Sequence, residues 1–457
     1  MRRFFVTALV LLFVIVSHGH EPSGTLPVLY VNTVNSTPVD QRQYYVEATA
    51  WLDASMTDKY ESVGSESKPL RLGIRGRGNS SWWSVEKKPY KLKFTDDVSL
   101  LGMTASQHFA LLHWLGSTTA YFREPIGYEA ARRLGDAWVP SVDALEVVLN
   151  GDYIGLYFLS ETVRVEPGRV NIARQPDCVD NEDLVRSGWL VEIDNYDDEN
   201  QSVLYEPDGR ELKLTYKSPE LLSEAQKNYI ESEFTEIIRR VHDRLPASDD
   251  WLEIVDGESM ARYYIVTELL QNKDGCNGSF YWHKSADSRW IAGPLWDLSY
   301  SLERPAEDTY LHTLPLSSNP KLIRAMLDNS GFREIIKDVW QPFYEDGAEW
   351  VDRVAYEWIE KMKVAAVTDK ERWTFGHSDV HYAGRIAASI MKQNIEWFNG
   401  YLQSAQFNRW DSSGIVRGGV DDDAAGPVFD LMGRRVLHPA KGGVYVRDGR
   451  KFVSRGQ

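Results

Sequence analysis

Two aspartates, Asp274 and Asp297, have the surroundings in this sequence that most favour chemistry. Asp274 lies in the segment Asn272-Lys273-Asp274-Gly275, directly after a predicted helix over Glu258–Gln271, and Asp297 ends a predicted hairpin that begins near Ser279. A hairpin of this length can bring both carboxylates to one cleft. One would orient an attacking hydroxyl while the other holds a metal ion beside phosphates, as phosphoryl transfer requires. Either aspartate alone is also typical of a turn.

A glycine-rich segment, Arg75-Gly76-Arg77-Gly78-Asn79-Ser80-Ser81, lies between predicted strands at Leu70–Gly76 and Tyr90–Phe94. Glycines allow a backbone to approach a polyphosphate closely, and nearby cations add attraction. The alternation in the second strand places Lys91 and Lys93 on one face, so at least one of them can reach inward. The predicted phosphate-binding residues are therefore Arg75, Arg77, Gly78, Lys91 and Lys93. A solvated basic turn is the alternative interpretation.

A helix is predicted over Arg123–Leu134, ended by Gly135. Glu129 in its middle is a candidate partner for one of the strand lysines, and an exposed helix carboxylate is the alternative. Strands are predicted on both sides of this helix: Leu26–Thr33 and Tyr44–Leu52 before it, and a hairpin of Val142–Leu149 and Tyr153–Leu159 turning at Asn150-Gly151-Asp152 after it.

After Glu161 the pattern becomes mainly helical. Helices are predicted from Ser223 to Leu245 and from Glu258 to Gln271, and again over 321–327, 332–340, 350–364 and 387–402. The expected class is α+β, with a β-rich front lobe (26–160), an α-rich back lobe (161–410) and a small β module (426–457). This is the arrangement of an atypical protein-kinase-like two-lobe fold.

Composition and the N-terminus limit the function classes. The chain has 457 residues and a formal charge of −16, which disfavours a general nucleic-acid binder. Residues 1–19 read as a signal peptide: two arginines, a short apolar run and small residues, too short to span a membrane. A buried strand or a membrane anchor is the alternative there. Cys178 and Cys276 can form one disulfide or remain two thiols. No HExxH or Gly-x-Ser-x-Gly motif is present.

The ordered motifs together resemble the CotH kinase family over roughly Leu26–Leu402. The segments that carry the resemblance are Arg75–Trp82, Lys87–Phe94, Arg123–Gly135, Val148–Tyr157, Glu161, Arg169–Ile172, Gly188–Asp194, Asn272–Gly275 and Gly293–Asp297. The resemblance implies an atypical kinase fold that binds ATP with Mg²⁺ or Mn²⁺. It also implies phosphorylation of Ser or Thr in exported or cell-surface proteins.

Carried over by position, the resemblance makes Asp274 the catalytic residue, Asp297 a metal ligand and Lys93 or Lys91 the phosphate-binding lysine. Glu161 would lie at the hinge near adenine. Kinases place a second metal ligand, an asparagine, five residues beyond the catalytic aspartate. Here that position is Ser279, with Asn277 nearby as a substitute. Many relatives also follow Trp-Asp with a second acidic residue, where this chain has Leu298, Ser299 and Tyr300.

The expected function is a secreted, ATP- and Mg²⁺-dependent kinase whose partner is an exported or cell-surface protein. Two alternatives stay open. One is a non-catalytic surface or adhesion protein with the same fold, and the other is adenylylation or glutamylation at the same nucleotide site. The segment 426–457 resembles C-terminal modules of secreted Bacteroidetes proteins, which implies a role in export or surface sorting.

Overall fold

The computed structural model describes residues 20–113, 118–243, 250–275, 278–303, 322–373 and 379–408, together with short strand segments between 415 and 453. The expected signal peptide, Cys276 and Asn277 lie outside these residues. Cys178 is an exposed free thiol. In the described part of the chain, no helix has the length and apolar character needed to cross a membrane.

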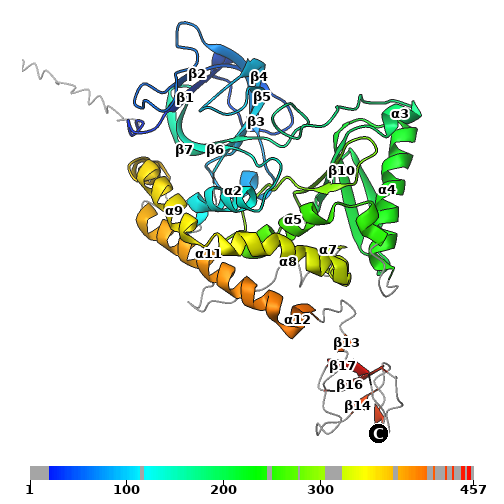
Figure 1. Cartoon of the computed structure of the whole chain (residues 1–457). Helices are drawn as coiled ribbons and strands as arrows, with labels where there is room; N and C mark the ends of the chain where they lie inside the picture. The colour runs from blue at the N-terminus through cyan, green and yellow to red at the C-terminus, as the bar shows by residue number, and fades with distance from the viewer. Residues whose placement is uncertain are drawn as a thin grey trace, which may run out of the picture.

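The front of the molecule is a closed β-barrel with the strand order β1-β2-β3-β4-β5-β7-β6 (Figure 1). All neighbours pair antiparallel except β1 and β6, which pair in parallel and close the barrel. The expectation of a β-rich front lobe did not include this closure. The strands are β1 (Val28–Thr33), β2 (Val46–Asp53), β3 (Leu70–Gly76), β4 (Tyr90–Val98), β5 (Ser106–Leu112), β6 (Val142–Leu149) and β7 (Asp152–Glu161).

Alternating side chains fill the barrel. In β4, Leu92 and Phe94 are buried in the barrel core, whereas Lys91 and Lys93 face outward. The predicted hairpin at Asn150-Gly151 is confirmed, with Asn150 and Gly151 both at positive φ. The strand β5 was not predicted because its residues are buried on both faces and show no alternation.

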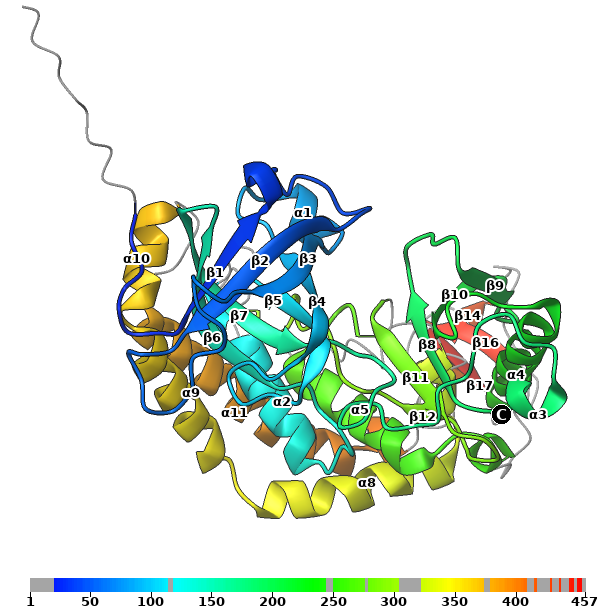
Figure 2. The same cartoon turned by 90° about the horizontal axis from the view of Figure 1, so that it is seen from above.

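The helix α2 (Arg123–Arg133) lies between the barrel and the helices of the back part (Figure 2). The expected helical segments are present as α4 (Glu224–His242), α5 (Gly257–Leu270), α7 (Leu322–Met326), α8 (Ser330–Glu345), α9 (Glu349–Met362) and α11 (Val380–Gln403). Ser223 caps α4 in a capping box with Gln226, as its position before the helix predicts. Helix α10 (Ala365–Arg372) was not predicted. Short helices are also present: α1 (Ser80–Trp83), α3 (Glu182–Val185) and α12 (Ala405–Asn408).

The back part also contains a five-stranded sheet, of which only the hairpin between Ser279 and Asp297 was predicted. Its order is β12-β11-β8-β10-β9, and the helix α4 lies beside it (Figure 1). The strands are β8 (Trp189–Asp194), β9 (Gln201–Tyr205), β10 (Glu211–Ser218), β11 (Phe280–Lys284) and β12 (Ile291–Ala292). The back part is mainly helical, as expected, although its strands β8, β9 and β10 were not predicted, and the α+β class is confirmed. Short strands β13–β17 between Ile415 and Val453 agree with the expected β character of the C-terminal module.

A buried ion pair joins the barrel to the helices. Lys87 Nζ lies 2.6 Å from Asp369 Oδ1 on α10, and both side chains are almost fully buried. Lys87 also donates to the carbonyl of Leu156 at 2.5 Å, while Asp369 accepts from the Leu156 amide at 2.9 Å. The Tyr121 hydroxyl donates to Asp369 Oδ2. Both charges are thus compensated, and removing either would leave the other buried without a partner.

We therefore expect Lys87→Ala to lower the free energy of unfolding by roughly 3–5 kcal/mol. The matched control is Lys392→Ala, which removes an exposed pair with Asp352 at 2.7 Å and should cost less than about 1 kcal/mol. Urea unfolding of the two variants measures the difference. Equal losses would show that the Lys87–Asp369 pair does not hold the barrel to the helices.

Candidate active site

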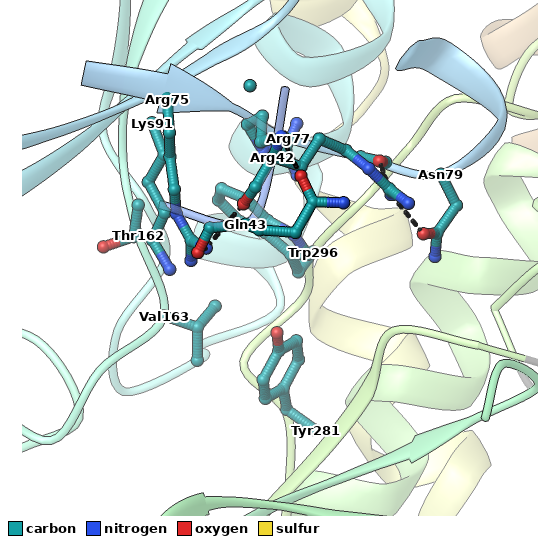
Figure 3. Close-up of a pocket in the computed structure, with 12 residues that line it drawn as sticks. Arg42, Gln43, Arg75, Arg77, Asn79, Lys91, Thr162, Val163, Tyr281 and Trp296 are labelled. Carbon is teal, nitrogen blue, oxygen red and sulfur yellow. Dashed lines mark hydrogen bonds between the residues drawn. The ribbon is translucent and has the colours of Figure 1, made fainter. Parts of the chain in front are cut away.

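A cavity of about 440 Å³ lies between the barrel and the strand β11 (Figure 3). The barrel side contributes the end of β3, the glycine-rich segment, Lys91 and the segment before β2, while the other side contributes Tyr281 and Trp296. The floor includes the chain that leaves β7. The lining residues are Arg42, Gln43, Arg75, Gly76, Arg77, Gly78, Asn79, Lys91, Thr162, Val163, Tyr281 and Trp296.

Of the two candidate lysines, the structure places Lys91 in the cavity and leaves Lys93 exposed. Lys91 makes no hydrogen bond or ion pair with the described residues. Burial, and then the nearby charges of Arg75, Arg164, Arg77 and Lys217, lower the pKa of Lys91 to about 8. Burial and the same basic surroundings lower the pKa of His108 on β5 to about 3. This wall of the cavity is suited to an anion.

The glycine-rich segment shapes the upper edge of the cavity. Gly78 has a φ of +77°, a conformation that glycine adopts without strain. A Cβ on Gly76 would collide with the ring of Trp82, so this ring can pack against the end of β3 only because residue 76 is glycine. Arg77 extends across the cavity and lies 5.7 Å from the ring centre of Trp296. The segment therefore contacts the opposite wall directly before Asp297.

The two carboxylate loops are tied together by Asn272. This side chain is 1% exposed. Its Oδ1 accepts from the Asp274 amide at 3.2 Å, and its Nδ2 donates to the Asp297 carbonyl at 3.2 Å. Burial, and then the charges of Asp297, Asp194 and Glu303, raise the pKa of Asp274. The structure thus brings the two predicted aspartates into one loop pair, and Asp274 has the environment of a proton acceptor.

Asp297 is held by Ser299, one of the residues that stand where many relatives have a second acidic residue. It has a φ of +56°, and its carboxylate accepts from the Ser299 hydroxyl and from the Ser299 amide at 3.3 Å. The buried Arg123, at the start of α2, donates to the Ser299 carbonyl and lies 3.8 Å from Glu303. Helix α2 therefore positions the loop after Asp297 through Arg123.

The donor set is compatible with magnesium held in part by a nucleotide. Among the described residues, no three His, Cys, Asp or Glu side chains are grouped as a ready-made metal site. Mg²⁺ is usually bound by one or two carboxylates together with phosphates and water, and Asp297 can supply one such carboxylate. Ser279 lies at the start of β11 with a φ of +53° and has no hydrogen bond to Asp297 in the structure. The other candidate ligand, Asn277, lies outside the described residues.

Two predicted site residues lie elsewhere. Glu129 pairs with Arg133 of its own helix at 2.9 Å instead of with a strand lysine. Glu161 is buried, and its two carboxylate oxygens accept from the amides of Thr104 at 3.1 Å and Ser141 at 2.9 Å. Its role here is to join loops of the barrel, while Thr162 and Val163 directly after it line the cavity. The structure does not support a contact of either glutamate with a ligand in this cavity.

An ion pair that lies behind the Tyr281 wall of the cavity was not predicted from the sequence. Glu192 on β8 lies 2.6 Å from Lys217 on β10, and Tyr281 of the cavity wall pairs with Glu192 across β8 and β11. The signal in the sequence was the Gly188–Asp194 segment, but its partner lies on a strand that was not predicted. Arg75 was expected to contact phosphates. Its Nη1 instead donates to the Arg42 carbonyl at 2.7 Å, while its guanidinium lies over the Tyr45 ring.

Comparison with known proteins agrees with this geometry. No curated protein matches the chain. The model of the family described as CotH kinase protein matches residues 74–399, a range that includes the glycine-rich segment, Lys91, Asp274 and Asp297. Since this match covers most of the chain, the protein belongs to the CotH kinase protein family.

Proposed function

We propose that this protein is a secreted, ATP- and Mg²⁺-dependent kinase that phosphorylates Ser or Thr of an exported or cell-surface protein. The observation that carries the proposal is the cavity itself. Lys91, which has no partner in the part of the chain that the structure describes, and the glycine-rich segment form one wall, and the joined loops of Asp274 and Asp297 lie beside the other. The barrel and the part behind it would act as the two lobes of a kinase-like fold.

The roles follow from position and charge. Lys91 and the amides of the glycine-rich segment would hold the phosphates, and Val163 beside the end of β7 would border the base. Asp297 would hold the metal ion, which neutralises phosphate charge when bound. Asp274, whose pKa is raised, would accept the proton of the acceptor hydroxyl. A bond then forms from the acceptor oxygen to the γ-phosphorus as the bond to the ADP oxygen breaks.

Secretion is proposed from the N-terminal sequence, in which two arginines precede a short apolar run and small residues. Adenylylation is the second candidate for the same cavity, because these residues hold the phosphates of a nucleotide without defining the acceptor. The mass added to an acceptor protein distinguishes a phosphoryl from an adenylyl group.

We expect Asp274→Asn to lower kcat about 10²–10⁴-fold while leaving the KM for ATP nearly unchanged, because the proton acceptor is lost and the phosphate contacts remain. The matched control is Asp287→Asn, in the exposed turn between β11 and β12. Transfer of label from γ-labelled ATP to a secretome extract measures both. Full activity in Asp274→Asn would contradict the assignment.

Lys91→Met should raise the dissociation constant for ATP about tenfold or more, because a charge-assisted hydrogen bond is worth roughly 1.5–3 kcal/mol. Lys93→Met on the same face of β4 should change it less than about twofold, since that side chain is exposed outside the cavity. Titration calorimetry gives both constants. The reverse ranking would assign the phosphates to Lys93.

The affinity for ATP should fall as the pH rises through about 8, because the Lys91 ammonium loses its proton there and with it the attraction to phosphate. Below that pH the lysine is charged and the affinity is at its maximum. Lys91→Arg should remove the decline, since arginine stays protonated. An unaltered pH profile in Lys91→Arg would mean that another group titrates.

A further inference from the structure

The segment between β1 and β2 lies against the glycine-rich segment, although it precedes the residues 74–399 that match the family. The carbonyl of Gln41 accepts from the Gly76 amide at 2.9 Å. The carbonyl of Arg42 accepts from Arg75 Nη1 at 2.7 Å. These bonds fix the segment along the start of the glycine-rich turn.

The side chain of Arg42 continues this contact to the tip of the turn (Figure 3). Its Nη1 donates to the carbonyl of Gly78 and to Asn79 Oδ1 at 2.7 Å. Its guanidinium lies 5.4 Å from the ring centre of Trp83. The Arg42 Nε is buried and makes no hydrogen bond with the described residues. Arg42 is therefore held at the cavity edge by Gly78, Asn79 and Trp83.

These contacts change what an anion would meet at the turn. The Gly78 carbonyl and the Asn79 amide oxygen are both acceptors at the edge of the cavity, and uncompensated acceptors repel phosphate. Arg42 satisfies both with one cation, so the turn presents a positive charge there instead. The φ of +77° at Gly78 belongs to the conformation in which this carbonyl meets Arg42.

We propose that Arg42 is a positioning residue for the phosphates of the nucleotide: it fixes the glycine-rich turn and neutralises two oxygens that would otherwise repel them. This inference rests on the proposed function. It predicts that Arg42 acts on the phosphate part of a nucleotide and not on its nucleoside part. Lysine can replace its charge but not its planar guanidinium, which stacks on Trp83 while binding two oxygens.

The test compares Arg42→Gln, Arg42→Lys and the control Arg71→Gln, which removes an exposed charge from β3 outside the cavity. Dissociation constants for ATP, ADP and adenosine are measured with Mg²⁺, together with kcat and the KM for ATP. Arg42→Gln should raise the dissociation constants for ATP and ADP about tenfold or more, and that for adenosine less than about twofold. Arg42→Lys should recover part of the loss, and Arg71→Gln should match the unaltered protein.

Hydrogen exchange of the nucleotide-free protein provides a second readout. Exchange of the amides over 76–82 should rise in Arg42→Gln and stay unchanged in Arg71→Gln, because the turn loses its contacts. An equal loss of affinity for ATP and for adenosine, or no change in either affinity, would overturn the role of Arg42. The kinase proposal would stand in both cases. If the unaltered protein bound no nucleotide at all, the proposed function would fail, and the phosphate role of Arg42 with it.

Discussion

The separation of charge between the basic barrel wall of the cavity and the acidic loops beside its opposite wall is the constraint on which the site depends. On the barrel side, Lys91 has no partner among the described residues, and several arginines surround it. Next to the opposite wall, Asp297 directly follows the lining residue Trp296, and its loop is joined to that of Asp274. Burial, and then the charges of Asp297, Asp194 and Glu303, raise the pKa of Asp274. An anion that carries a divalent cation, such as a magnesium nucleotide, would compensate the basic wall with its phosphates and the acidic loops with its cation.

The fold keeps these charges in place through a few buried polar contacts. Asn272 fixes the two aspartate loops relative to each other, and Arg123 connects the loop after Asp297 to helix α2. The buried pair of Lys87 and Asp369 joins the barrel to α10, and the closure of the barrel prevents β3 and β4 from separating. A site made of two walls needs such connections, because its geometry depends on how the two parts are held together.

Much of this was predictable from local pattern. The bounds of β3 and α2, the turn at Asn150 and the nearness of the Asp274 and Asp297 loops follow from alternation, helix-end signals and turn residues. The β11–β12 hairpin was predicted, but the rest of its sheet and the barrel closure were missed, because they depend on pairings between distant segments that leave no local period. Glu129 and Glu161 were assigned by analogy of position. Their partners, Arg133 and the amides of Thr104 and Ser141, depend on packing that a single sequence does not reveal.

The most direct test of the central claim is to map where a magnesium nucleotide binds, since a second cavity of about 460 Å³, lined by Leu134, Asp256, Arg262 and Phe343 among others, is as large as the first. Hydrogen exchange with and without MgATP makes this comparison on the intact protein. The account predicts protection over 75–79, around 162–163 and in the loops of Asp274 and Asp297. Protection confined to the second cavity, or none at saturating MgATP, would contradict it.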